Sequence, residues 1–133
     1  MFPTARYDSA ANRFAPHTDY IDFEGFDWTD AELKMQIRDR KNGGMIRADL
    51  AQVTTAAAEG VRIDSVSTVN GIPVTRVAWR INETTMEAMS AEAMGLEPDA
   101  EPVLFLDLHV TPVGELKFVP IEGSFTVKAG VTE

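Results

Sequence analysis

Histidine and cysteine, the side chains that most often bind zinc, are scarce in this sequence. His17 and His109 are its two histidines, and it contains no cysteine. Asp107 and His109 are two positions apart, so on a strand they would share one face and could hold a base or a metal. Zinc usually takes three or four ligands. A packed or solvated histidine explains the spacing better, and we expect no metal site.

An acidic run, DYIDFEGFDWTD, offers oxygen ligands of the kind that calcium prefers. Its carboxylates belong to Asp19, Asp22, Glu24, Asp27 and Asp30. Their spacing fits no EF-hand loop, and a solvated strand followed by a turn explains them better. The sequence also has no GxSxG or SxxK pattern and no glycine-rich loop for a phosphate. We therefore expect a protein that is not an enzyme and has no cofactor.

The two tryptophans lie in different settings. Trp79 falls on an alternating apolar face with Val77 and Ile81, which predicts a core position. Trp28 stands beside a predicted turn, so we expect it to be the exposed one. An exposed indole can stack on a sugar, and a carbohydrate-binding or host-recognition module is therefore an alternative function.

Composition and charge narrow the class of protein. The 133 residues suit one domain, with 44% hydrophobic and 25% charged residues. The 12 basic and 21 acidic residues give a net charge of −9, which disfavours nucleic acid as a partner. No run approaches the roughly 18 apolar residues of a membrane span, and the N-terminus lacks the apolar core of a signal peptide. We expect neither export nor membrane binding.

Residues 1–18 differ from the remainder in charge and pattern. Arg6 and Arg13 outnumber the single acid Asp8, and Pro3 and Pro16 interrupt regular structure. We predict an extended arm, distinct from a single domain over 19–133; a floppy terminus is the alternative. The residues expected to bind a partner are Phe2, Arg6, Tyr7, Arg13 and Phe14.

The segment DAELKMQIR, residues 30–38, is built from helix formers but alternates like a strand. Ala31, Leu33, Met35 and Ile37 would scatter around a helix, yet they share one face of a strand. Burial outweighs weak propensity, so we predict a strand. Asn42-Gly43-Gly44 and Asn70-Gly71 then predict hairpin turns, the first leading into a strand over 45–50.

The remaining segments complete an all-β pattern with one helix. PVLFLDLHV, residues 102–110, is apolar on both faces, as a central strand would be. Strands are also expected over 116–121 and 124–127. Residues 83–94 contain helix formers, with Asn82 as a cap and Gly95 as a stop. About seven strands predict an Ig-like or jelly-roll-like β-sandwich, with an open barrel as the alternative.

Two segments of the sequence carry a family pattern. The first is IDFEGFDWTDAELKMQIRDRKNGG, in which the matching positions are Asp22, Gly25, Gln36, Ile37, Arg38 and Gly44. The second begins at Leu106-Asp107-Leu108 and continues through Thr111-Pro112, Gly114, Gly123, Val127 and Val131-Thr132. Together they resemble a family of small structural proteins encoded among the virion genes of tailed bacteriophages. The sequence departs from the family at Phe23-Glu24-Gly25, where Leu-Thr-Gly is usual, and in its longer N-terminal arm.

The resemblance implies a non-enzymatic β-sandwich module of the tail, baseplate or fibre-attachment region. Its partners would be other virion proteins or further copies of itself. It would be made in the host cytoplasm and reside in the virion. A capsid decoration protein is a variant of the same idea.

Overall fold

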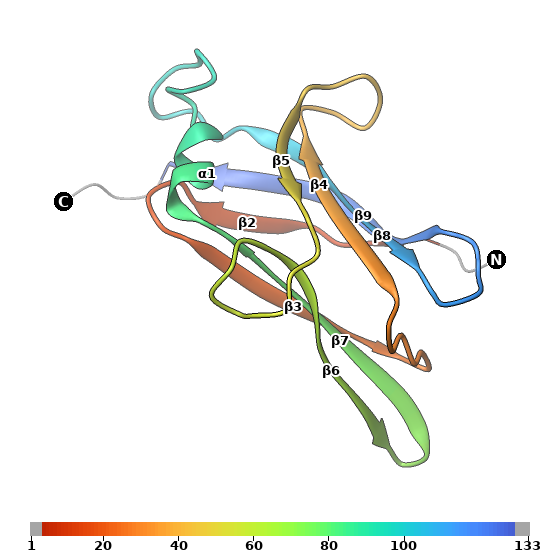
Figure 1. The fold of residues 1–133 in the computed structure, drawn as a ribbon. Coiled ribbons are helices and arrows are strands. Elements are labelled where there is room, and N and C mark those ends of the chain that lie inside the picture. The colour runs from red at the N-terminus through yellow and green to blue at the C-terminus, as the bar shows by residue number, and fades with distance from the viewer. Residues whose placement is uncertain (1–3, 130–133) are drawn as a thin grey trace.

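The computed structural model describes residues 4–129, which form two β-sheets and one short helix (Figure 1). The strands in chain order are β1 (Ala5–Arg6), β2 (Ser9–Asn12), β3 (His17–Glu24), β4 (Glu32–Arg38), β5 (Ile46–Leu50), β6 (Gly60–Val69), β7 (Ile72–Ile81), β8 (Val103–Thr111) and β9 (Phe118–Lys128). The helix α1 spans Glu83–Ala88, between β7 and β8. The predicted β-sandwich is confirmed, and the separation into two sheets excludes the open barrel.

The larger sheet has the order β1-β9-β8-β4-β5, with β2 also paired to β9. The smaller sheet has the order β3-β7-β6. The two sheets pack face to face, and α1 lies at one end of the sandwich, where it buries Met86 (Figure 1). β8 is the central strand of the larger sheet, which confirms the expectation drawn from its apolar faces.

The core is made by alternate residues of the facing strands. In β4, the side chains of Leu33, Met35 and Ile37 are buried, whereas Glu32 and Lys34 are exposed. Val77, Trp79 and Ile81 of β7 face them from the smaller sheet. The strand predicted from the alternation of residues 30–38 is therefore confirmed.

The predicted hairpin turns are also confirmed. β4 and β5 pair antiparallel across residues 39–45, and β6 pairs with β7 across Asn70-Gly71. Asn70 and Gly71 have φ angles of 52° and 79°, the positive values that a two-residue type I′ turn requires. This turn chemistry explains why the tight hairpin is readable from the sequence.

The number of strands, the extent of the last strand and the end of the helix differ from the prediction. The structure has nine strands within residues 4–129, not about seven, because the N-terminal segment contributes two short ones. The strands expected over 116–121 and 124–127 are one strand, β9, which continues through Gly123. The helix ends at Ala88 and not at Met94, and its N-cap Asn82 makes no side-chain capping bond. Turns fill the rest of the expected helix and reach Gly95, whose φ is 76°.

Candidate assembly surfaces

The N-terminal segment is extended, as predicted, but it is bound to this chain's own β-sheet. β1 and β2 run parallel to β9 in one continuous register, from Ala5 opposite Ile121 to Asn12 opposite Lys128. The Tyr7 amide donates to the Glu122 carbonyl at 2.9 Å. β3 then begins at His17, one residue before the boundary expected at 18. The segment is therefore part of the sandwich, and not a separate arm.

The close approach of this segment depends on Gly123. A Cβ atom added at Gly123 would lie 1.9 Å from the Tyr7 carbonyl oxygen and 2.9 Å from an Asp8 carboxylate oxygen. In the space that a side chain would fill, Asp8 accepts hydrogen bonds from the Ser124 amide at 2.9 Å and the Ser124 hydroxyl at 3.0 Å. These bonds hold the pKa of Asp8 below its usual value. Residue 123 must be a glycine for the strands to meet in this way.

Tyr7 is the aromatic anchor of the segment. Its ring meets Trp79 edge to face, with the centroids 5.8 Å apart. Its hydroxyl donates a hydrogen bond to the Asp19 carboxylate. Burial, together with this carboxylate, raises the pKa of Tyr7 to about 12. One of the residues expected to bind a partner is thus committed to this chain's own core.

The other predicted arm residues have different surroundings. Arg13 is buried and donates to the Pro98 carbonyl at 2.6 Å, and its guanidinium lies 4.5 Å from the centre of the Phe14 ring. Phe14 is partly exposed, and Arg6 is exposed and bonded to Asp8 at 3.0 Å. Phe2 lies outside the described residues. Among the members of this set that the structure describes, Arg6 and Phe14 have the most exposed side chains.

The prediction that Trp28 is exposed is wrong. Its side chain is 3% exposed, and it packs against the rings of Phe23, Phe26 and Phe118 at centroid distances of 4.7, 5.0 and 5.8 Å. The Trp28 amide donates to the Thr75 hydroxyl at 3.0 Å. Phe23 and Phe26 are neighbours in the sequence, whereas Phe118 comes from β9, so the turn folds its tryptophan inward against the larger sheet.

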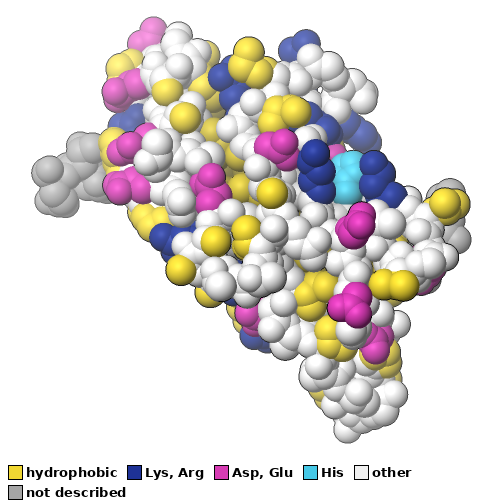
Figure 2. Space-filling model, viewed as in Figure 1, with side chains coloured by type: hydrophobic (Ala, Val, Ile, Leu, Met, Phe, Trp, Pro, Cys, Tyr) yellow, Lys and Arg dark blue, Asp and Glu magenta, His cyan; other side chains and the backbone are white. Residues whose placement is uncertain are grey.

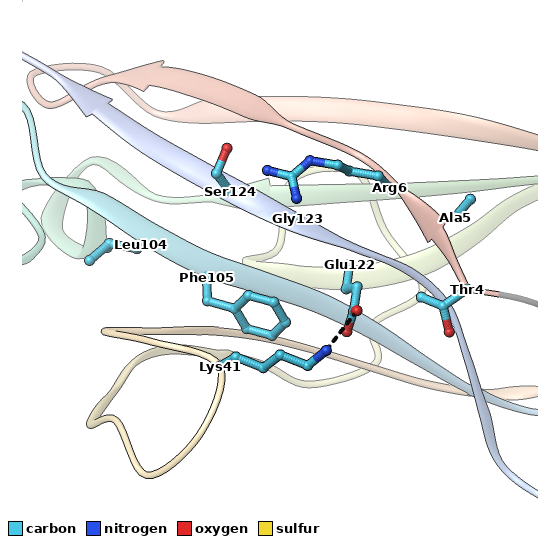
Figure 3. Close-up of a pocket in the computed structure, with 9 residues that line it drawn as sticks. All are labelled: Thr4, Ala5, Arg6, Lys41, Leu104, Phe105, Glu122, Gly123 and Ser124. Carbon is cyan, nitrogen blue, oxygen red and sulfur yellow. Dashed lines mark hydrogen bonds and ion pairs between the residues drawn. The ribbon is translucent and has the colours of Figure 1, made fainter.

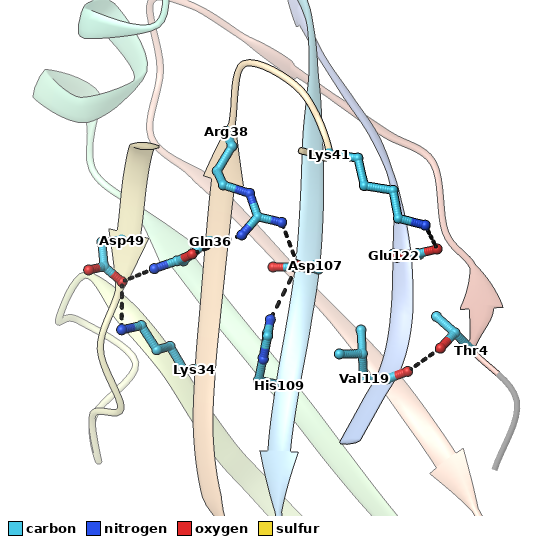
Figure 4. Close-up of polar contacts among 10 residues, drawn as sticks. All are labelled: Thr4, Lys34, Gln36, Arg38, Lys41, Asp49, Asp107, His109, Val119 and Glu122. Carbon is cyan, nitrogen blue, oxygen red and sulfur yellow. Dashed lines mark hydrogen bonds and ion pairs between the residues drawn. The ribbon is translucent and has the colours of Figure 1, made fainter. Parts of the chain in front are cut away.

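Asp107 and His109 share the outer face of the larger sheet, as their spacing predicted (Figure 4). Asp107 is 5% exposed, and its Oδ2 atom lies 2.8 Å from Nη2 of Arg38 and 3.2 Å from Nε2 of His109. Gln36 accepts a second hydrogen bond from Arg38, at 3.1 Å. This network joins β4 to β8 and explains how an acidic residue can be buried on a sheet surface.

A shallow hollow of about 350 Å³ lies on the same face, beside the N-terminal segment (Figure 3). Thr4 and Arg6 border it on one side, and Phe105 and Lys41 on the other. Lys41 reaches across to Glu122 at 3.0 Å. The lining mixes charged side chains with apolar ones such as Phe105. The ion pair of Lys41 and Glu122 joins the β4–β5 turn to β9 across this hollow.

Three carboxylates of the acidic run are bonded to neighbouring side chains of this chain. Asp19 bonds to Tyr7, and Asp27 bonds to Thr29. Asp22 binds Arg76 through both carboxylate oxygens, at 2.8 and 3.1 Å. Within residues 4–129, no three histidine or acidic side chains are grouped to hold a metal ion. No helix in that range has the length and hydropathy to cross a membrane.

A surface that the sequence reasoning missed is the projecting hairpin, residues 64–74, formed by the end of β6 and the start of β7. Figure 1 shows it extending beyond the neighbouring strands. Val69 and Ile72 are paired and are 54% and 51% exposed, and Val66 on the opposite face is 38% exposed. Residues 65–75 contain no charged side chain. In Figure 2 its tip, at the lower right, shows white and yellow atoms only.

A signal for this surface was present in the sequence. In a chain with 25% charged residues, an uncharged stretch over 65–75 around an Asn-Gly turn is unusual. Residues 51–53 pair with β6 at Val61, before the projecting part begins. The sequence of β6 does not reveal that the opposite sheet ends before Val66 and Val69.

A scan against protein-family models found no match, and a search of curated proteins found no similar sequence.

Proposed function

We propose that this chain is a non-enzymatic structural protein of the virion of a tailed bacteriophage. It acts as an assembly or adaptor module in the tail, baseplate or fibre-attachment region. The projecting hairpin carries this proposal, because it exposes Val66, Val69 and Ile72 on two faces of a ribbon. An isolated two-stranded ribbon is marginally stable in water, and exposed apolar patches mark contacts with other proteins.

The two segments that resemble the phage family are neighbours in the fold. Gln36 lies opposite Asp107, and Ile37 lies opposite Leu106. Arg38 of the first segment binds Asp107 of the second at 2.8 Å. Residues 69 positions apart in the sequence therefore form one structural unit.

The partners of such a module would be other virion proteins or further copies of this chain. The projecting hairpin has no charged residue over 65–75, so it suits an apolar groove or an open sheet edge on a protein. The net charge of −9 would repel the phosphates of nucleic acid. A capsid decoration protein, the variant of this role, would bind its neighbours through the same projecting hairpin. The carbohydrate-binding alternative depended on Trp28, which is buried.

Incorporation into particles tests the role of the projecting hairpin. Val69→Asp places a charge on its exposed face, and we expect this variant to be lost from assembled particles. Met45→Asp is the matched control, because Met45 is 62% exposed and lies in the hairpin between β4 and β5. Circular dichroism should show both variants folded. Incorporation of Val69→Asp at the level of the unmodified chain would contradict the proposal.

A further inference from the structure

The edge of the larger sheet next to β9 is built by the N-terminal strand, here defined as residues 4–12. All of its ladder pairing is parallel and is made with β9. Parallel pairs are slightly less stable per residue than antiparallel pairs. An edge strand is also paired on one side only.

The N-terminal strand is anchored by few buried side chains. Ala11 is buried, and Tyr7 packs on the core against Trp79. Ala5, Arg6, Ala10 and Asn12 are exposed. Regions with little buried apolar surface open at a lower free energy than the core does. We therefore expect this strand to detach while the two sheets remain folded.

Detachment uncovers a site of defined shape along β9. The site contains the free backbone of β9, the space above Gly123, the Ser124 amide and hydroxyl, and the ring of Trp79. Thr4 donates to the Val119 carbonyl at 2.7 Å, and Asp8 bonds to Ser124. Each of these contacts joins residues 4–12 to another part of the fold. Residues 4–12 of a second copy can therefore make every one of them.

The connection between the N-terminal strand and β3 is short, and its sequence favours an extended backbone. Residues 13–16 carry the chain from one sheet to the other, and the Ala15 amide bonds back to the Asn12 carbonyl at 3.3 Å. Ala15 precedes Pro16, and a residue before proline favours extended backbone over a turn. Straightening this hinge would carry the N-terminal strand away from its own β9. Short hinges of this kind favour exchange between subunits.

We propose that the N-terminal strand is exchanged between copies of this chain, so that residues 4–12 of one copy complete the larger sheet of another. The inference deepens the proposed assembly role by naming a second copy as the partner at this edge. The contacts between the subunits would be the same ones that residues 4–12 make with β9 and Trp79 within one chain.

Cysteine cross-linking tests the exchange in a chain that has no cysteine of its own. Ala10 lies opposite Thr126 in the parallel register. Neighbouring strands are about 4.8 Å apart, within the Cα separation that a disulfide spans. Full-length Ala10→Cys and Thr126→Cys chains are mixed, incubated and oxidised. We expect a covalent heterodimer whose yield rises with protein concentration.

The matched control uses a pair of strands inside the sheet. Lys34 lies opposite His109 on β4 and β8, so mixed Lys34→Cys and His109→Cys chains should remain largely uncross-linked. Insertion of Gly-Ser-Gly after Phe14 should lower the heterodimer yield, because a longer hinge lets each strand close on its own chain. A yield no higher than that of the control would overturn the proposal. So would failure of a chain with both Ala10→Cys and Thr126→Cys to form a disulfide at all.

The two proposals fail in different ways. Cross-linking in a protein that is absent from phage particles would keep the exchange and remove the virion role. Incorporation into particles without cross-linking would keep the virion role and remove the exchange.

Discussion

Gly123→Ala should release the N-terminal strand from β9 with little direct effect on the rest of the fold. The added methyl group would lie 1.9 Å from the Tyr7 carbonyl oxygen, whereas real Cβ contacts are at least 3.0 Å. The strand must therefore move by 3.0 − 1.9 = 1.1 Å or more. Such a shift breaks the 2.9 Å bond from Tyr7 to Glu122 and the 2.9 Å bond from Ser124 to Asp8.

The size of the effect follows from the interactions that this shift removes. Each hydrogen bond contributes about 0.5–1.5 kcal/mol, and burial of an aromatic side chain such as Tyr7 contributes up to about 3 kcal/mol. Water replaces part of these interactions at an exposed edge. We therefore expect the free energy of unfolding to fall by about 2–4 kcal/mol, a large part of a typical domain's 5–15 kcal/mol. Urea denaturation measures this change.

A double-mutant cycle makes the assay specific to the N-terminal strand. In a chain that lacks residues 1–12, no Tyr7 carbonyl opposes residue 123, so Gly123→Ala should change the stability by less than about 0.5 kcal/mol. Trypsin should also cleave after Arg6 faster in the full-length Gly123→Ala chain than in the unmodified one. An equal loss of stability with and without residues 1–12 would refute the steric reasoning.

Three further substitutions test the core, the outer face and the pH dependence. Trp28→Ala should lower the free energy of unfolding in urea by about 3–5 kcal/mol, because it empties an aromatic cluster; an effect below about 1 kcal/mol would contradict its burial. Asp107→Ala should cost about 2–3 kcal/mol by the same measurement, since it leaves Arg38 half-buried without its carboxylate; an unchanged urea midpoint would contradict this. Burial lowers the pKa of His17 from 6.5, so the unfolded chain binds more protons and stability falls as the pH drops below 6.5. His17→Phe, which keeps a ring against Phe125, should lose less stability between pH 7.5 and 5.5; an equal loss would show that His17 is not responsible.

The strands of the sandwich were predictable because short stretches of sequence, through apolar alternation and turn residues, determine them. Alternation of apolar residues identified β4 against its helix-forming composition, since burial of Leu33, Met35 and Ile37 outweighs propensity. The Asn70-Gly71 turn was readable because its backbone needs positive φ angles. The shared face of Asp107 and His109 followed from their spacing alone.

The surfaces were less predictable because they depend on distant contacts. The prediction for Trp28 was wrong because its side chain packs on Phe118 and its amide bonds to Thr75, two distant contacts that a turn signal does not reveal. The docking of residues 5–12 on β9 is a parallel pairing across most of the chain. The role of Gly123 appears only when Tyr7 is placed above it. The projecting hairpin required knowing where the opposite sheet ends.

The central claim, that this chain is a virion structural protein, is tested most directly by the protein composition of purified phage particles. Particles would be banded on a density gradient from cells that produce this chain, and their proteins identified by mass spectrometry. We expect the chain to band with the particles, in a constant ratio to the major structural proteins across fractions. A chain found only in the soluble fraction, with intact particles lacking it, would rule out a virion role.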